Sequence, residues 1–354
     1  MCSRPSSARR PARWRAPERS RALTTLADEL LSALTDLGGA GLAVVDLQAG
    51  RDVDLPSGPG VVRVGVHRAG SLPDRELDQF DILLSAAPSA PAPWVGLAPD
   101  QLEPALRRLE AIVAAQPLAA GIAAQVLRAS LSLGFDEALA AESIAYSMLL
   151  SSEAFRAWRA ANPPPARDDL DGPRVAVARD GETLSIRLTR PGANNAVDAR
   201  MRDALCEALE FALIDPDRAP VVLSGEGRVF SEGGDLAEFG SFGDPGRAHL
   251  VRTLRSPAAL LHRLGDRATA RLHGACIGSG LEIPAAAARV TARRHTFFRL
   301  PEVAMGLIPG AGGTVTVPRR IGRHRACWMA ISGVDIRLST ALAWGLVDAA
   351  EDGR

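Results

Sequence analysis

The sequence predicts an α/β protein in two regions separated by a proline-rich linker, and three observations lead to this prediction. Short runs of branched apolar residues between turn-rich segments, such as residues 61–67, are typical of strands. Apolar residues at helical spacing follow over residues 102–160. Beyond the linker, at residues 161–173, strands and helices are expected to alternate as they do in α/β domains.

The composition is that of a globular chain without net charge. Of the 354 residues, 47% are hydrophobic and 23% are charged, and 41 basic residues balance 41 acidic ones. A net charge of zero supplies no field that would attract nucleic acid or an anionic membrane, so we expect neither as a partner. The sequence contains no Lys, which excludes a lysine Schiff base.

Cysteine and histidine usage predicts a cytoplasmic protein without a metal site. Cys2, Cys206, Cys276 and Cys327 stand far apart in the sequence and form no CxxC pair, and the six histidines are scattered. Such spacing lacks the pattern of a metal site and suits a reducing compartment. The longest apolar region, residues 111–127, is interrupted by polar residues and a proline, so we expect no membrane span.

The N-terminal half is expected to be an α/β region over residues 23–160, preceded by a disordered Arg- and Pro-rich leader over residues 1–22. We predict three strands and then three helices, the last with Asp136 as its N-cap. No catalytic constellation is visible in this half, so its helices are expected to pack and to expose their charged faces. The predicted strands are residues 41–47, 61–67 and 80–86, and the predicted helices are residues 102–115, 118–133 and 136–160.

The C-terminal half, residues 174–354, is expected to form the catalytic domain. It begins with a hairpin over residues 174–188, because Asp180-Gly181 is a dipeptide that type I′ turns favour. Alternating helices and strands follow, at residues 197–213, 220–224, 245–264 and 268–273. Loops after such strands are where functional residues usually lie.

Two glycine-rich loops follow predicted strands. They are residues 227–236, GRVFSEGGDL, and residues 273–282, HGACIGSGLE. Closely spaced glycines allow backbone N–H groups to approach a ligand atom, and two converging N–H donors make an oxyanion hole. Taken alone, either loop is more often the pattern of a tight turn without a ligand.

A third segment, residues 299–314, RLPEVAMGLIPGAGGT, completes the set. In this order the three segments resemble the crotonase superfamily, the enoyl-CoA hydratases and isomerases. The resemblance covers about residues 172–354 and includes the segments 190–196 and 332–347. It implies the family's spiral of repeated ββα units. It also implies an acyl-CoA thioester as substrate, with no separate cofactor because coenzyme A is part of that substrate.

Four site residues follow from the resemblance. The backbone N–H groups of Gly234 and Ser279 would form the oxyanion hole, where family members commonly have Gly in place of Ser279. A backbone donor tolerates Ser if its φ and ψ angles are accessible. Glu282 and Glu302 stand at the two positions where hydratases of the family have their catalytic glutamates.

Paired carboxyl groups suit the addition of water to a 2-enoyl-CoA thioester. One can deprotonate the water while the other delivers a proton to the α carbon. Glu302 has apolar neighbours, so an uncommitted carboxylate there would be costly to bury. Glu282 has a second interpretation, a carboxylate that favours a helix N-terminus. Relatives with a glutamate only at the Glu302 position tend to be isomerases, which makes double-bond isomerisation the alternative reaction.

The remaining candidates lie in the same loops. Arg228 occupies a basic position that in some relatives helps to hold the phosphates of coenzyme A, although an exposed Arg without a ligand is the equal alternative. Asp235, Gly278 and Gly280 are assigned to the substrate-binding surface. Glu232 is unusual, because the family generally has a small neutral residue there; it could affect the enolate or the specificity, or point to solvent.

The order of the segments departs from the family. Its members usually continue past the Gly-Leu-Val turn at residues 345–347 into helices that cover the site and build a trimer, whereas this sequence ends at Arg354. Residues 102–160 resemble that helical module, so we expect them to supply the cover. The strands before them are interpreted as the remnant of a second, inactive crotonase-like unit.

Two further expectations follow by analogy with the family. The first is a homo-oligomer, a trimer or a pair of trimers. The second is an alternative to an enzyme, namely a degenerate acyl-CoA-binding scaffold subunit, which Glu232 and Ser279 favour and the two retained glutamates oppose.

Overall fold

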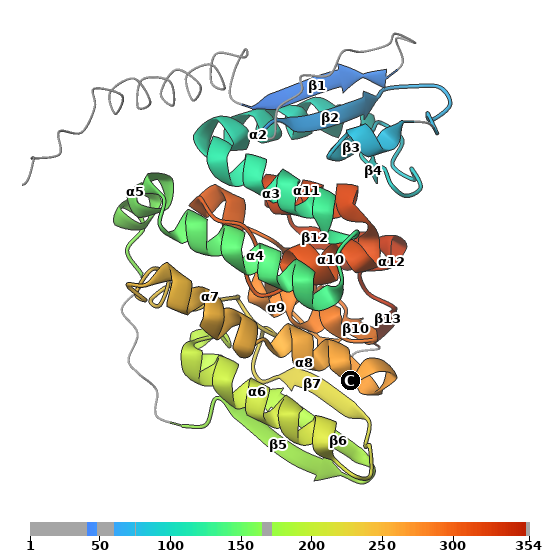
Figure 1. Cartoon of the computed structure of the whole chain (residues 1–354). Helices are drawn as coiled ribbons and strands as arrows, with labels where there is room; N and C mark the ends of the chain where they lie inside the picture. Colours follow the sequence, from blue (N-terminus) through green and yellow to red (C-terminus); the bar gives the residue numbers. More distant parts are fainter. Residues whose placement is uncertain (1–40, 48–59, 75, 165–171, 352–354) are drawn as a thin grey trace, which may run out of the picture. The chain divides into compact units, whose positions relative to one another are not determined.

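Three sheets and the helices around them make up the part of the chain that the computed structural model describes, residues 41–47, 60–74, 76–164 and 172–351 (Figure 1). These residues belong to one compact unit. The predicted leader at residues 1–22 lies outside the described residues. The α/β class predicted from the sequence is confirmed.

The N-terminal sheet has the order β1-β2-β3-β4, and all neighbours are parallel. The three predicted strands are present, and a fourth strand of two residues was not predicted, since so short a run carries no periodicity. The valines of β2 alternate along the strand and so share one face of the sheet, on which they are fully buried. The strands are β1 Leu42–Asp46, β2 Val62–His67, β3 Ile82–Ser85 and β4 Val95–Gly96.

The helices that follow are α2 Leu102–Ala115, α3 Pro117–Ser130, α4 Phe135–Leu150 and α5 Glu153–Ala161. The prediction of one helix over residues 136–160 is wrong. The chain breaks at Ser152, whose side chain accepts a hydrogen bond from the N–H of Phe155 and so caps a new helix. The N-cap of α4 is Gly134, whereas Asp136 lies in its first turn, 3.0 Å from Arg263.

The predicted hairpin is confirmed as the antiparallel pair β5 Val175–Asp180 and β6 Thr183–Leu188. Its turn differs from the prediction. Asp180 pairs with Thr183, so the central residues are Gly181 and Glu182, and of these two only Gly181 has a positive φ, +57°. A type I′ turn requires a positive φ at both positions and is therefore excluded.

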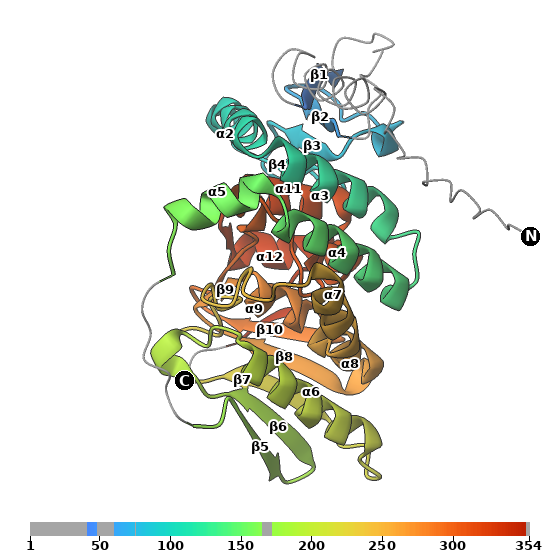
Figure 2. The same ribbon diagram turned by 60° about the vertical axis from the view of Figure 1, so that its left-hand side comes forward.

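These strands belong to a six-stranded sheet of order β13-β10-β8-β7-β6-β5, in which only β5 and β6 are antiparallel (Figure 2). The prediction of a single helix at residues 245–264 is wrong, because Pro257 lacks an N–H and excludes Ser256 from the helical region. The elements up to this point are α6 Ala199–Ile214, β7 Val221–Gly225, α7 Pro245–Leu254, α8 Pro257–Arg263 and β8 Ala268–Leu272.

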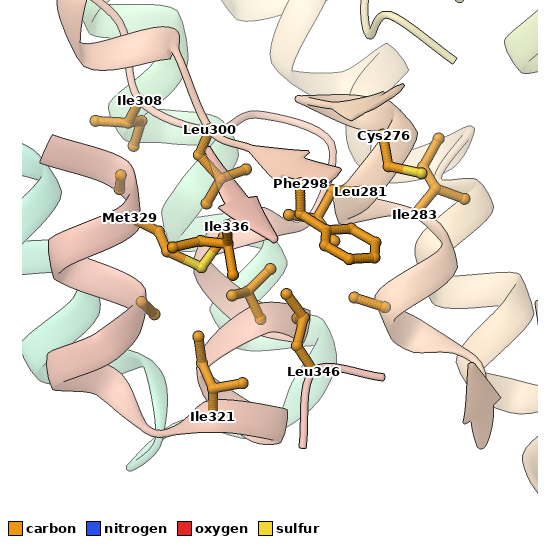
Figure 3. Packing of buried hydrophobic residues seen from close by; sticks show 14 of the residues in the cluster. Cys276, Leu281, Ile283, Phe298, Leu300, Ile308, Ile321, Met329, Ile336 and Leu346 are labelled. Carbon is orange, nitrogen blue, oxygen red and sulfur yellow. The ribbon is translucent and has the colours of Figure 1, made fainter. Parts of the chain in front are cut away.

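A three-stranded sheet of order β12-β11-β9 carries the site residues at its ends. Its apolar side chains pack against the helices that follow, and Figure 3 shows Phe298 of β11 beside Leu281. The elements are β9 Ala275–Ile277, α9 Ser279–Glu282, β10 Arg289–Arg293, β11 Phe297–Arg299, α10 Gly313–Ile321, α11 Arg323–Ser332, β12 Ile336–Arg337, α12 Leu338–Trp344 and β13 Ala349–Glu351.

One hydrophobic core runs through both halves. The same cluster contains Val64 and Leu109 from the N-terminal half and Leu223 and Met329 from the C-terminal half. Helix α11 packs against α2, α3 and β3, and α4 lies between α3 and α7 (Figure 1). The boundary predicted at residues 161–173, of which 165–171 lie outside the described residues, therefore does not divide two cores.

No single described helix is long and apolar enough to cross a membrane. The segments Pro99–Ala115 and Pro117–Ser130 meet that test only as a pair, and they are bent by 109° relative to each other.

Candidate active site

A cavity of about 630 Å³ lies between α4 and α7 of the two halves and the glycine-rich loops. Five of the residues predicted from the sequence line it, and they come from loops far apart in the chain. Arg228, Gly278 and Gly280 are not among the lining residues. The predicted residues that line the cavity are Gly234, Asp235, Ser279, Glu282 and Glu302.

The two glycine-rich loops are held together at Ser231. Its N–H donates to the carbonyl of Ala275 at 3.2 Å, and its carbonyl accepts from the N–H of Ile277 at 3.1 Å. A Cβ at Gly280 would lie 2.5 Å from that same carbonyl oxygen. Gly280 is thus required for the close approach of the loops rather than for contact with the cavity.

This packing brings two backbone donors to the cavity. Gly234 and Ser279 both line it, and neither N–H donates a hydrogen bond to any of the described residues. Ser279 is the first residue of α9, where an N–H has no acceptor within the helix. The Oγ of Ser279 is also buried without a hydrogen-bond partner. The cavity therefore has donors available for an oxygen atom of a ligand.

Glu282 ends α9, and its side chain is buried. Its Oε2 accepts hydrogen bonds from the N–H groups of Ala311 at 2.7 Å and Gly313 at 2.9 Å, at the start of α10. The sequence also allowed a carboxylate that binds the N-terminus of a helix. Glu282 does so, but the helix is α10 and not its own helix α9. Burial raises the pKa of Glu282 to about 7, although these backbone hydrogen bonds lower it.

Glu302 follows β11 and begins the short helix η7 Glu302–Met305. Only 7% of the residue is exposed, and its Oε2 is buried without a hydrogen-bond partner. Burial, and next the charge of Glu282, raise the pKa of Glu302 well above its ordinary value. A carboxyl group in this setting holds its proton to a higher pH than a solvent-exposed one.

The two carboxyl groups converge on Gly278. A Cβ at this position would lie 2.5 Å from Oε1 of Glu302 and 3.8 Å from Oε1 of Glu282. Gly278 also has a φ of +50°, which disfavours other residues. The space left by its missing side chain is what allows both carboxyl groups to occupy one site. Within the described ranges, no group of three or more His, Cys, Asp or Glu side chains could hold a metal ion.

Asp235 lines the cavity, but its carboxylate is engaged in a buried ion pair. Its Oδ2 lies 2.7 Å from Arg190, and its N–H donates to the carbonyl of Val197 at 2.9 Å. These contacts hold the first loop against residues 190–197. They also fix the position of the neighbouring Gly234.

Arg228 and Glu232 are exposed and do not line the cavity. The structure thus brings no guanidinium from Arg228 to the site. Of the alternatives for Glu232, exposure to solvent is the one observed.

Helix α4 contributes residues that the sequence did not single out. Leu139, Glu142, Ser143 and Tyr146 line the cavity, in a half of the chain whose helices were expected to cover the site without a catalytic constellation of their own. Arg252 of α7 lies over the ring of Tyr146, with its guanidinium carbon 4.9 Å from the ring centre. The signal that pointed to this helix was the resemblance of residues 102–160 to the family's covering helices.

Comparison with known proteins agrees with this geometry. The family described as enoyl-CoA hydratase/isomerase matches residues 179–351. The 2,3-dehydroadipyl-CoA hydratase of Escherichia coli (strain K12) is 32% identical over 177 residues, 49% of this chain and 67% of that protein. Mevalonyl-coenzyme A hydratase SIDH of Beauveria bassiana (strain ARSEF 2860) is 30% identical over 195 residues, 52% and 68% of the two chains.

Among solved structures, an enoyl-CoA hydratase from Thermoplasma volcanium GSS1 is similar, with 31% identity and a TM-score of 0.48 over 51% of this chain and 73% of that chain. The sequence relatives and the matched region together identify the C-terminal half as a crotonase-like domain. The chain belongs to the enoyl-CoA hydratase/isomerase family.

Proposed function

We propose that the protein adds water across the double bond of a 2-enoyl-CoA thioester. The observation that carries this proposal is the convergence of two buried carboxyl groups, Glu282 and Glu302, on Gly278 in one cavity. Different pKa values for two such groups suit them to opposite roles, one as a base and the other as an acid.

In the proposed reaction the carboxylate of Glu282 takes a proton from water, and the water oxygen bonds to the β carbon. The electrons of the double bond move toward the thioester carbonyl, whose oxygen becomes an enolate oxygen. Glu302 then gives its proton to the α carbon, and the product is a 3-hydroxyacyl-CoA thioester. The two carboxyl groups end with their protonation states exchanged, and a proton must pass between them to restore the enzyme.

The N–H groups of Gly234 and Ser279 are proposed to stabilise the enolate oxygen. Both line the cavity and have no acceptor among the described residues. A preorganised donor of this kind typically contributes about 3 to 4 kcal/mol to the transition state.

The dependence of the rate on pH follows from these assignments. Glu282 must be ionised to accept a proton from water, so kcat/KM should rise with pH through about 7, its pKa in the protein without substrate. Glu302 must hold a proton, so kcat/KM should fall again at a higher pH, where it ionises. Initial rates measured across the pH range should give a bell-shaped profile; a rate that falls as pH increases through 7 would reverse the roles.

Replacement of Gly234 tests the oxyanion hole. Gly234→Pro removes the N–H and should reduce kcat by about two to three orders of magnitude. Gly234→Ala is the matched control, because it keeps the N–H but brings a Cβ to 2.6 Å from the ring of Phe239, as proline also would. Steady-state kinetics of both folded variants compare the two effects. Equal losses would mean that crowding of Phe239, and not the missing donor, is responsible.

One observation favours double-bond isomerisation as a second candidate. Oε2 of Glu282 accepts two backbone hydrogen bonds, whereas Oε2 of Glu302 has none. A single uncommitted carboxyl group can move a proton between the α and γ carbons without a water molecule. A product of unchanged mass with a shifted double bond would identify this reaction.

A further inference from the structure

Four consecutive backbone N–H groups, at residues 311–314, point alternately to two buried carboxyl groups. The first and third donate to Oε2 of Glu282 at 2.7 and 2.9 Å. The second and fourth donate to Oε1 and Oε2 of Glu142, each at 2.7 Å. Glu142 comes from α4, in the other half of the chain. The segment that holds Glu282 is thus itself held by a side chain of the N-terminal half.

We propose that Glu142 is a positioning residue, which fixes residues 311–314 and through them the orientation and ionisation of Glu282. This inference rests on the proposed role of Glu282 as the base. It also gives the N-terminal half a specific part in the reaction, beyond covering the cavity.

The surroundings of Glu142 show how it would act. The residue is 1% exposed, and it accepts a third hydrogen bond, from the hydroxyl of Thr314 at 2.7 Å. Burial, and next the charge of Glu282, raise the pKa of Glu142 to about 8, whereas its hydrogen bonds to Thr314 and Gly312 lower it. Glu142 reaches Glu282 through the backbone segment whose N–H groups both side chains accept.

Other titratable groups surround this pair. Glu302 lies on η7, Tyr146 lies one turn further along α4, and Arg252 faces Tyr146 from α7. Burial raises the pKa of Tyr146 above its ordinary range and lowers that of Arg252. Tyr146 therefore stays neutral where Glu282 ionises.

Glu142→Gln distinguishes the positioning role from a role in packing alone, because Gln keeps the size of the side chain and removes one acceptor oxygen. A carboxamide has one oxygen where the carboxyl group has two, so either the N–H of Gly312 or that of Thr314 is left buried without an acceptor. The segment is then free to shift, and the hydrogen bonds to Glu282 lengthen. Because those bonds lower the pKa of Glu282, their loss raises it.

The experiment compares full-length Glu142→Gln with Glu137→Gln, a matched change on the exposed face of the same helix. For Glu142→Gln we expect kcat to fall by about 10- to 100-fold and KM to stay within about threefold. The acid limb of the pH profile should move upward by about one unit. Amide hydrogen exchange in a peptide covering residues 307–318, measured without substrate, should become about tenfold faster. Glu137→Gln should match the unmodified protein in all four measurements.

A Glu142→Gln protein with unchanged exchange and an unchanged acid limb would overturn the proposal. If that variant does not fold, Thr314→Val takes its place, since it removes only the hydroxyl donor to Glu142. It should give smaller changes in the same directions, and their absence would likewise overturn the proposal. If the unmodified protein hydrates no enoyl thioester, the proposed function fails, and the exchange measurement alone decides on the role of Glu142.

Discussion

Replacing Glu302 with Gln should reduce kcat for hydration by about a hundredfold or more and leave thioester binding nearly unchanged. The carboxamide keeps the size of the side chain but cannot deliver a proton to the α carbon. Glu302 is suited to that step because burial raises the pKa of its carboxyl group and its Oε2 has no hydrogen-bond partner among the described residues. Stopped-flow or steady-state loss of the enoyl thioester absorbance measures the effect, and calorimetry measures binding.

Glu282→Gln should give a loss of similar size, because the same cavity then lacks the base for water. Glu232→Gln is the matched control, since this exposed carboxylate lies outside the cavity, and its kcat should stay within about twofold of the unmodified value. Full hydratase activity in Glu282→Gln would exclude the two-carboxyl mechanism and favour isomerisation through Glu302 alone.

Separation of the two halves should abolish activity. A fragment of residues 172–354 lacks α4, which lines the cavity, and exposes the part of the core that packs against α2 and α3. Exposed apolar surface of this kind leads to aggregation or altered assembly. Size-exclusion chromatography with light scattering and an activity assay measure both effects. Adding residues 23–160 as a separate chain should restore solubility and activity.

The control is the full chain with a protease recognition site inserted between residues 164 and 172. After the protease cuts this site, the shared core should keep the two halves together, so activity should persist. If the fragment alone is soluble, fully active and of unchanged oligomeric state, the N-terminal half is not part of the active site. We also expect the intact protein to be a cyclic homo-oligomer, a trimer or a pair of trimers, which the same chromatography measures.

Local sequence patterns predicted most strands and several helices, because these elements depend on residues that are near neighbours in the chain. The antiparallel pair β5 and β6 and the helix Leu102–Ala115 are examples. The breaks at Ser152 and Ser256 were missed because apolar spacing continues across them, although a serine N-cap and the following Pro257 were visible in the sequence. At both positions the capping residue, and not the apolar periodicity, decides where the helix begins.

The site was predicted in part because its residues come from segments with a family resemblance. Glu282 and Glu302 were named from the sequence, and both line the cavity. The hydrogen bonds of residues 311–314 to Glu142 could not be predicted, since the two segments are about 170 residues apart and nothing near Glu142 distinguishes it from the exposed acids of α4. Arg228 is exposed outside the cavity, and its contact with the phosphates of coenzyme A stays a prediction.

Mass spectrometry of the product tests the proposed function most directly. Purified protein is incubated with a panel of 2-enoyl-CoA thioesters that differ in chain length and branching, with Glu302→Gln as the inactive control. The account predicts that at least one thioester gains the mass of one water molecule and that this gain is lost in the control. An unchanged mass with a shifted double bond, or binding without any conversion, would contradict hydration and identify an isomerase or a binding scaffold in its place.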